Sequence, residues 1–321
     1  MRTLRIRPIA HFSLLALLTL SLFSCSVRPG AAQDPPFKRE TDTVYGRKYG
    51  TALTMDVFTP TANANGVGVI WVVSGGWYSS HDGIVPQSPG SPIGELIKRG
   101  YTVFAVVHGS QPKYTIPEVL GDMHRAVRYI RFHAVDYKID PQRMGITGAS
   151  AGGHLSLMQG TAGTMGDPNA KDPVERVSSR VQAVACYFPP TDFLNYGKAG
   201  QVAVGGGILV NFRPPFDFHE QDPKQGGLFV KITDPARIQA IGKEISPISH
   251  VTPDDPPTRL IHGDADTLVP IQQSEIMIAK LKESGVPAEL IVKKGGGHGW
   301  ADVGGDMTKI VDWFDTYLKR K

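Results

Sequence analysis

One serine in this sequence has the neighbours that a catalytic nucleophile requires. Ser150 lies in Gly148-Ala-Ser-Ala-Gly152, which fits the G-x-S-x-G pattern of a sharp turn between a strand and a helix. Residues 143–147 can supply the strand, and residues 150–159 can begin the helix. Such a turn lifts the hydroxyl above the sheet, and the amino end of the helix favours negative charge beside it. The pattern therefore predicts Ser150 as a nucleophile.

A serine hydroxyl is a weak nucleophile until a base takes its proton, and that base needs a carboxylate to orient it. Asp264 and Asp266 follow an apolar segment, and His298 lies in a glycine-rich loop after the next apolar segment. The order serine, acid, histidine along the chain is the one that accompanies this nucleophile turn. We therefore predict His298 as the base, while spacing alone leaves both aspartates open as the acid. His262, at a strand end, is expected to stabilise the turn.

A pair of glycines after another apolar segment could stabilise the charge that develops in such a reaction. A tetrahedral intermediate carries an oxyanion, whose hydrogen-bond donors must already be in place. Val73-Ser-Gly-Gly-Trp77 follows the apolar run 67–73, and its glycines would let backbone N–H groups point at the reacting carbonyl. The nucleophile turn would add the N–H of Ala151. These residues together predict the parts needed for acyl transfer.

Apolar runs that alternate with helical patterns must position these residues. Continuous apolar runs bounded by glycine or polar residues are typical of strands buried on both faces of a parallel sheet. Strands are expected as an opening hairpin at 43–45 and 53–58, and then at 67–73, 101–107, 143–147, 181–187, 259–261 and 288–292. Helices are expected at 119–130, 270–282 and 310–318. This alternation predicts a mostly parallel sheet with helices on both faces.

The segment 193–243 interrupts this alternation and is predicted to be an insertion between two strands. It is irregular and rich in glycine, proline and aromatic residues. Its aromatic side chains either cap the catalytic cleft or pack into a small core of the insertion itself; they are Tyr196, Phe212, Phe216 and Phe218. The sequence leaves both interpretations open.

The composition is that of an ordinary folded domain and excludes several classes of protein. The chain has 321 residues, of which 41% are hydrophobic and 20% charged, so it can bury a sizeable core. Two cysteines exclude a disulfide framework, and no group of His and Cys has the spacing of a zinc site. The net charge is +4, and no stripe of Lys and Arg predicts nucleic-acid binding. Cys186 is expected to be a buried core thiol, and His154 to serve packing.

The first 25 residues have the pattern of an export signal. Three arginines precede the apolar run 12–23, which is too short to span a bilayer. The run ends at Leu22-Phe-Ser-Cys25, which resembles a bacterial lipoprotein signal with Cys25 as the lipidated residue; the alternative is an ordinary signal cleaved near 30–32. We therefore expect an exported protein, lipid-anchored in the bacterial cell envelope or otherwise secreted. Its expected parts are a signal or lipoprotein segment at 1–25, a flexible tether at 26–38 and a catalytic domain at 39–321.

Five segments of the sequence carry a resemblance to a known family. They are Ser74-Gly-Gly-Trp77, Asp122-Met-His-Arg-Ala-Val-Arg-Tyr-Ile-Arg131, Gly148-Ala-Ser-Ala-Gly-Gly-His154, His262-Gly-Asp-Ala-Asp-Thr-Leu-Val-Pro270 and Gly297-His-Gly-Trp300. Their order and spacing resemble those of α/β-hydrolases, and the sequence most resembles bacterial esterases of the feruloyl/acetyl esterase (BD-FAE) type, which are related to the catalytic domain of prolyl oligopeptidases. The resemblance covers about residues 42–318.

The resemblance implies a role for several residues. In that family the acid stands four residues after the strand-end histidine, which implies Asp266 and leaves Asp264 as a turn residue. The implied oxyanion donors are the backbone N–H groups of Gly76 or Trp77 and of Ala151. The family's oxyanion loop is usually His-Gly-Gly-X, whereas Ser74 stands in place of that histidine here.

We therefore expect a serine carboxylic-ester hydrolase that works through an acyl-enzyme. The expected substrate is a small-molecule or polysaccharide ester, such as an acetyl or feruloyl ester, and the mechanism requires no metal or organic cofactor. Two alternatives remain: a serine peptidase of the prolyl oligopeptidase type, and a catalytically inactive, lipid-anchored binding protein. No nucleic-acid partner is expected, and the expected contact with the membrane is through the N-terminal lipid.

Overall fold

The computed structural model describes residues 36–86 and 91–319. The predicted signal segment 1–25, with the predicted lipidation site Cys25, lies outside these ranges. Most of the predicted tether, residues 26–35, also lies outside them. Strand β1 begins at Phe37, so the last two residues of the range predicted as a tether belong to a strand instead.

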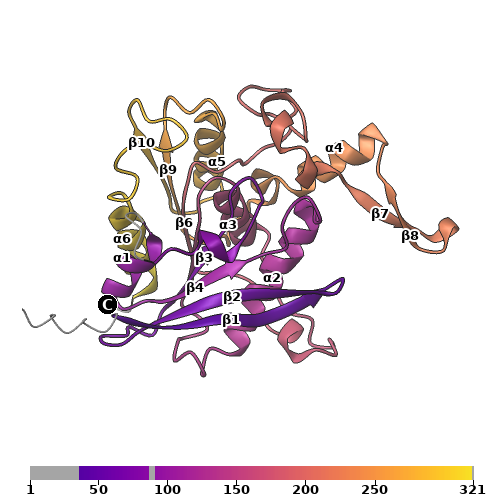
Figure 1. The fold of residues 1–321 in the computed structure, drawn as a ribbon. Coiled ribbons are helices and arrows are strands. Elements are labelled where there is room, and N and C mark those ends of the chain that lie inside the picture. Colours follow the sequence, from indigo (N-terminus) through magenta and orange to yellow (C-terminus); the bar gives the residue numbers. More distant parts are fainter. Residues whose placement is uncertain (1–35, 87–90, 320–321) are drawn as a thin grey trace, which may run out of the picture. The chain divides into compact units, whose positions relative to one another are not determined.

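The central sheet has eight strands (Figure 1). Ser150, Asp266 and His298 each follow the carboxyl end of one of its parallel strands. The strand order is β1-β2-β4-β3-β5-β6-β9-β10. The pairs β1–β2 and β2–β4 are antiparallel, and the later pairs are parallel. The strands are β1 (Phe37–Lys48), β2 (Thr51–Pro60), β3 (Gly68–Val72), β4 (Thr102–Val107), β5 (Met144–Thr147), β6 (Ala183–Tyr187), β9 (Thr258–Gly263) and β10 (Ala288–Lys293). The predicted mostly parallel sheet is confirmed.

Helices cover both faces of this sheet (Figure 1). They are α1 (Pro92–Lys98), α2 (Ile116–Phe132), α3 (Ala151–Thr161), α5 (Gln272–Glu283) and α6 (Met307–Leu318). On β3, Ile70 packs in one core with Val127 of α2, whereas the neighbouring Val69 packs in a second core with Ile310 of α6. Because successive strand residues face opposite sides, both must be apolar here, which explains the continuous apolar runs.

Helix α2 shows how local sequence sets an element. Thr115 and Glu118 form a capping box, in which the Glu118 carboxylate accepts from the Thr115 backbone N–H at 2.8 Å. The predicted apolar face is confirmed, since its members are fully buried: Val119, Met123, Ala126, Val127 and Ile130. The helix is therefore fixed at its start by the cap and along its length by the core.

The predicted insertion 193–243 does lie between two strands, β6 and β9, but it is not wholly irregular. It contains the hairpin β7 (His219–Asp222) and β8 (Leu228–Lys231), which projects from the sheet region in Figure 1. It also contains most of helix α4 (Pro235–Glu244), whose first turn is capped by the Asp234 carboxylate. Proline directly after this aspartate is a helix-start signal that the irregular composition obscures.

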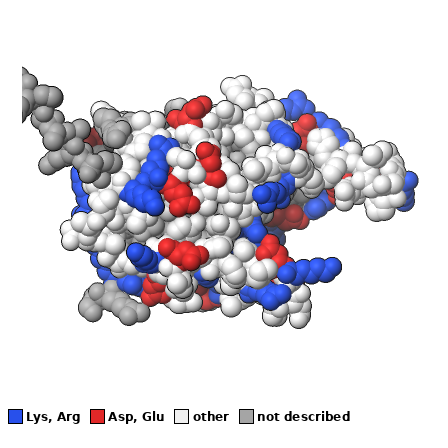
Figure 2. Space-filling view, turned by 60° about the horizontal axis from the view of Figure 1, so that its bottom comes forward, with Lys and Arg blue, Asp and Glu red and all other residues white. Residues whose placement is uncertain are grey.

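The surface mixes charges of both signs. Figure 2 shows Lys and Arg interspersed with Asp and Glu over one face, with no large area of a single sign. Of the helices in the described ranges, none has the length and apolar composition needed to cross a bilayer.

Candidate active site

Ser150 stands on a sharp turn between β5 and α3, as the glycine pattern predicts. Its backbone has φ +54° and ψ −119°, a conformation that few L-residues adopt. A Cβ added at Gly148 would lie 2.5 Å from the carbonyl group of Gly152, and one added at Gly152 would lie 2.8 Å from the Val72 oxygen. Only glycine fits at either position, because the strained turn brings these backbones together.

The structure brings Ser150, His298 and Asp266 together from three distant parts of the chain. His298 Nε2 lies 2.9 Å from Ser150 Oγ, and His298 Nδ1 lies 2.8 Å from Asp266 Oδ2. In the neutral state the serine hydroxyl can donate to Nε2 while Nδ1–H donates to the carboxylate. The three side chains therefore form one line along which a proton can move from the hydroxyl to the imidazole.

The Asp266 carboxylate is held in its ionised form. Burial acts to raise its pKa, but hydrogen bonds from His262, from His298 and from the Val269 amide outweigh burial and hold the pKa well below its ordinary value. Its second oxygen accepts from the N–H groups of Leu268 and Val269, each at 2.9 Å. The anion beside the imidazole is therefore fixed in place as well as charged.

Asp264, the other aspartate left open by spacing, does not reach the imidazole in this way. Its carboxylate accepts from the Gly295 N–H at 2.6 Å and pairs with Lys294 at 3.0 Å. A Cβ added at Gly263 would lie 2.1 Å from the Gly296 oxygen, so the two loops touch through bare backbone. The hydrogen bond and ion pair of Asp264 thus connect the end of β9 to the loop that carries His298.

The turn Ser74–Trp77 (residues 74–77) follows β3 and is close to the nucleophile turn, since Gly152 approaches the Ser74 backbone oxygen. Gly76 and Trp77 both have positive φ, +55° and +60°. Within the described ranges, no protein acceptor receives the N–H groups of Gly76, Trp77 and Ala151. Buried or half-buried N–H groups without a partner are uncommon, so these three are available to a ligand oxygen.

Two cavities reach Ala149, the residue before the nucleophile. One, of about 480 Å³, is lined by the turn after β3 and by Tyr78, Ser80 and Asp82. The other, of about 260 Å³, is mostly apolar and is lined by residues that include Phe188 and Met307. Both cavities therefore lie beside the nucleophile turn, and Trp71 and Ala149 line both of them.

The aromatic residues of the insertion pack rather than line these cavities. Phe193, Tyr196, Phe216 and Phe218 are buried, and the Phe216 ring centroid lies 5.2 Å from that of Trp77. The ring of Phe212 fills the space in which a Cβ of Gly76 would lie. The insertion therefore supports the turn 74–77 from the side, and its packing role is the one that the contacts favour.

One polar contact of this region was not predicted. His108 directly follows β4, and its Nε2 lies 2.8 Å from the Ser74 hydroxyl. The segment Val106-Val-His-Gly109 repeats the strand-His-Gly pattern of Leu260-Ile-His-Gly263. That repeat was the available signal, since both histidines stand where a parallel strand ends at the active-site edge.

A group of possible metal ligands lies elsewhere. Atoms of Asp42, Asp56 and His81 lie within 4.8 Å of one another. The buried Asp56 carboxylate, however, already accepts from Arg39 Nε at 2.8 Å and from the Asp42 N–H at 3.1 Å. Because a guanidinium balances this carboxylate, the cluster is accounted for by an ion pair.

Comparisons with known proteins identify the family to which this chain belongs. The BD-FAE family model matches residues 55–281. The probable carboxylic ester hydrolase LipM of Mycobacterium tuberculosis is 28% identical over 250 residues, which covers 77% of this chain and 52% of LipM. The chain spans about half the length of the curated relatives that it matches first.

Solved structures show the same fold. A truncated carbohydrate esterase from gut microbiota superimposes with a TM-score of 0.67 at 26% identity, over 89% of this chain and 99% of that one. A bifunctional GH43-CE protein of Bacteroides eggerthii gives a TM-score of 0.68 at 26% identity, over 87% of this chain and 38% of that one. The predicted resemblance is confirmed: the chain belongs to the BD-FAE family, a family of esterases with the α/β-hydrolase fold.

Proposed function

We propose that this protein hydrolyses carboxylic esters through a covalent acyl-enzyme on Ser150. The hydroxyl oxygen attacks the ester carbonyl as His298 Nε2 takes the proton, and a tetrahedral intermediate forms. His298 then gives that proton to the leaving alcohol, and the acyl group remains on the serine. Water, deprotonated by the same imidazole, attacks the acyl-enzyme; the imidazolium then returns the proton to Ser150 Oγ as the bond to the acyl group breaks and the acid leaves. The observation that carries this proposal is the continuous line from Ser150 through His298 to Asp266.

Electrostatics supports both charged partners of the transition state. The ionised Asp266 stabilises the imidazolium and keeps the Nδ1–H tautomer of His298. The N–H groups of Gly76 or Trp77 and of Ala151 are assigned to the developing oxyanion, because they lack protein acceptors in the described ranges. Preorganised donors of this kind supply on the order of 3 kcal/mol each to transition-state stabilisation.

We assign the substrate to acyl esters of carbohydrates, with acetyl and feruloyl esters as the candidates. The 480 Å³ cavity beside the nucleophile has Tyr78, which is 56% exposed, together with Ser80 and Asp82 on its lining. An aromatic face beside hydroxyl and carboxylate groups suits a sugar ring, whose C–H face packs on the ring while its hydroxyls donate to the oxygens. The apolar 260 Å³ cavity is assigned to the acyl group.

The test of the chemistry is Ser150→Ala with p-nitrophenyl acetate as substrate. We expect turnover to fall by roughly 10⁴-fold or more, because no other described group can take the place of the nucleophile. Ser284→Ala is the control, since Ser284 ends α5 through its backbone alone, and it should leave turnover unchanged. Activity near that of the wild type in Ser150→Ala would overturn the assignment.

The test of the substrate is a panel of acetylated xylan, methyl ferulate and a proline-containing peptide. Release of acetate or ferulate with no cleavage of the peptide is expected. Peptide cleavage would instead identify a serine peptidase. A wild-type protein that neither turns over any of these nor reacts with a fluorophosphonate probe would be the inactive binding protein.

The N-terminal sequence motivates a proposal on location. We propose that Cys25 carries lipid and anchors the protein in the bacterial cell envelope, because it follows the apolar run 12–23 in a pattern similar to a lipoprotein signal. Labelled palmitate should enter the wild-type protein in a bacterial host and be absent from Cys25→Ser. Equal labelling of the two would exclude this anchor.

A further inference from the structure

Two histidines that the proposed mechanism does not use are buried beside the turn 74–77. His108 is 3% exposed and His154 is fully buried. His108 follows β4, and His154 lies on α3, the helix that the nucleophile turn begins. Each contacts a side chain at one end of the turn: His108 contacts Ser74, and His154 contacts Trp77. Both histidines therefore contact the turn through hydrogen bonds as well as through packing.

The protonation state of His108 follows from its partners. Its Nδ1 lies 2.7 Å from the Gly109 carbonyl oxygen, which can only accept, so Nδ1 carries the proton. Nε2 is then bare and accepts from the Ser74 hydroxyl at 2.8 Å. The Ser74 proton is committed to this bond, which excludes its hydroxyl as an oxyanion donor in this arrangement.

His154 is fixed by the same logic. Its Nε2 lies 2.7 Å from the Ile245 carbonyl oxygen, so Nε2 carries the proton. Nδ1 accepts from the indole N–H of Trp77 at 3.1 Å. Ile245 is the residue after α4, so this histidine joins the turn, the nucleophile helix and the insertion.

The turn needs such support because its backbone is costly. Trp77 is a non-glycine residue with φ +60°, a left-handed conformation that costs roughly 1–2 kcal/mol. Its neighbour Gly76 has φ +55°, and the turn is closed by reciprocal hydrogen bonds of 2.9 Å between Gly75 and Tyr78. A loop in this conformation persists only when its surroundings hold it, and the two histidines hold it at both ends.

We propose that His108 and His154 are positioning residues for the oxyanion hole. One ring nitrogen of each histidine donates to a backbone carbonyl, and the other accepts from a side chain at one end of the turn. These bonds keep the turn in the conformation in which the N–H of Gly76 or Trp77 can donate to the same oxyanion as the N–H of Ala151. This inference rests on the proposed esterase function. Burial lowers the pKa of both histidines to about 4, so each keeps one donor and one acceptor at neutral pH.

The test compares leucine and glutamine at each position. Leucine removes both hydrogen bonds, whereas the amide of glutamine supplies one donor and one acceptor without charge. With p-nitrophenyl acetate, His108→Leu and His154→Leu should lower kcat roughly a hundredfold, the scale of a lost oxyanion donor, with KM changed less than threefold. The glutamine variants should recover most of kcat. His133→Leu, at the far end of α2, is the matched control and should behave as the wild type.

A second readout separates the oxyanion hole from the proton relay. Phenylboronic acid forms a tetrahedral adduct on the serine, so its affinity should fall in parallel with kcat in the leucine variants. The low-field proton resonance of the hydrogen bond between His298 and Asp266 should remain. If the leucine variants do not fold, Ser74→Ala and Trp77→Phe each remove one donor alone, and each should still lower kcat and boronate affinity about tenfold.

The outcomes distinguish this proposal from the function on which it rests. A wild-type protein without esterase activity would refute the proposed function itself. Active wild type together with unchanged kcat and boronate affinity in the folded leucine variants, or in Ser74→Ala and Trp77→Phe, would overturn the positioning role. Glutamine variants that fold but lose as much kcat as the leucine variants would also overturn it, because shape rather than hydrogen bonding would then be the requirement.

Discussion

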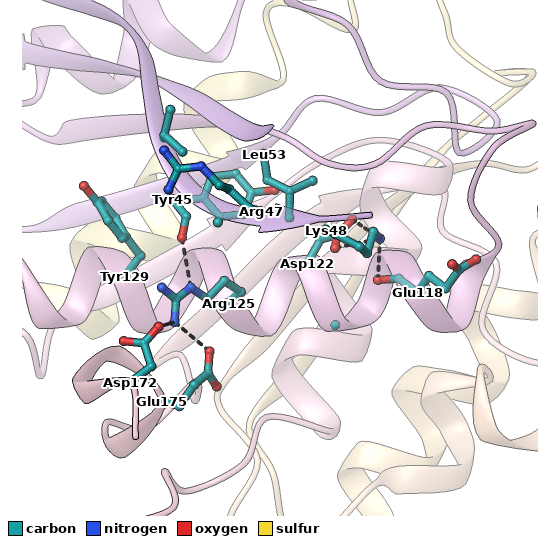
Figure 3. A pocket seen from close by; sticks show the side chains of 13 residues that line it. Tyr45, Arg47, Lys48, Leu53, Glu118, Asp122, Arg125, Tyr129, Asp172 and Glu175 are labelled. Carbon is teal, nitrogen blue, oxygen red and sulfur yellow. Dashed lines mark hydrogen bonds and ion pairs between the residues drawn. The ribbon is translucent and has the colours of Figure 1, made fainter. Parts of the chain in front are cut away.

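Two regions of this molecule gather polar side chains around a cavity, and they use them differently. A groove of about 680 Å³ lies between β1 and α2, and Figure 3 shows two of its cations, Lys48 and Arg125, joined to acidic side chains. Arg125 pairs with Asp172 at 2.7 Å and with Glu175 at 2.9 Å. At the active site, by contrast, the Ser150 hydroxyl contacts His298, and the N–H groups of Gly76, Trp77 and Ala151 have no protein acceptor in the described ranges. The ion pairs favour a role of the groove in stability, whereas the free N–H donors favour binding of a ligand oxygen at the site.

Asp122 connects the two regions. It pairs with Lys48 at 2.8 Å in the groove (Figure 3) and accepts from the Gly109 N–H at 2.9 Å, next to His108. Burial raises its pKa, and the nearby Lys48 opposes that rise. The groove therefore contributes to the active site by fixing the chain after β4. Substitutions at the active-site edge should change rate more than stability, and substitutions in the groove should do the reverse.

The largest effect is expected for the two aspartates of the active-site edge. Asp266→Asn should lower kcat roughly 10⁴-fold, because the amide no longer stabilises the imidazolium or its tautomer. Asp264→Asn removes the ion pair with Lys294, while its amide oxygen can still accept from the Gly295 N–H, so kcat should fall less than tenfold. Steady-state kinetics with p-nitrophenyl acetate measures both, and the opposite ranking would make Asp264 the catalytic acid.

A smaller effect is expected from acid pH, which should lower the free energy of unfolding through the buried histidines His108 and His154 at the same edge. The pKa of His108 and of His154 is about 4 in the folded protein, against 6.5 as the ordinary value. Between these pH values the unfolded chain binds protons that the folded protein excludes, so stability is full above pH 6.5 and falls as the pH drops towards 4. The shifts correspond to at most about 3 kcal/mol for each histidine.

Urea unfolding at a series of pH values checks this expectation. His154→Gln should flatten the decline between pH 6.5 and 4 in part, since burial lowers the pKa of His124 to about 4 as well and one of three excluded protonations is removed. Ser284→Ala, which removes no titratable group, should leave the slope as it is. A decline that His154→Gln does not change would show that other groups dominate the acid sensitivity.

In the groove, removal of the cation that faces Asp122 should cost stability. Lys48→Met leaves the carboxylate, whose side chain is 3% exposed, without its ion-pair partner. Breaking a buried pair from one side costs on the order of 3 kcal/mol. Lys280→Met, in the exposed pair with Glu283, is the control and should cost less than about 0.5 kcal/mol. Equal losses in urea unfolding would contradict the structural role given to the groove.

The parts of the fold that the sequence predicted are those whose signal is local. The buried strands β3 and β4 are apolar on both faces, and the glycines around Ser150, like Gly263 and Gly296 near the histidine loop, mark close backbone approach. The predicted strand 43–45 is shorter than β1, because most side chains of β1 are exposed and its backbone is held in place by pairing with β2. Helix α1 was missed because Pro92–Lys98 makes only two turns.

The site was predictable to a similar degree. The relay follows from the order of serine, acid and histidine, but spacing alone did not separate Asp264 from Asp266, because both follow the same strand. Only their contacts separate them, since one carboxylate reaches His298 and the other reaches Gly295. The bond between His108 and Ser74 joins the ends of two adjacent strands, and neither residue predicts the other from its local sequence.

The smallest loss of stability is expected for substitution of Arg125 in the groove. This substitution also tests most directly whether the groove affects stability without affecting kcat. Arg125 Nε donates to the Tyr45 carbonyl of edge strand β1 at 2.9 Å, and its Nη1 pairs with Glu175. Arg125→Met keeps the packing of the stem and should cost about 1 kcal/mol, the scale of a partly exposed pair. Since neither partner touches the relay, kcat should stay within twofold of the wild type. A tenfold loss of kcat at intact stability would instead show that the groove acts on catalysis, through the chain from β1 to the strand end at His108.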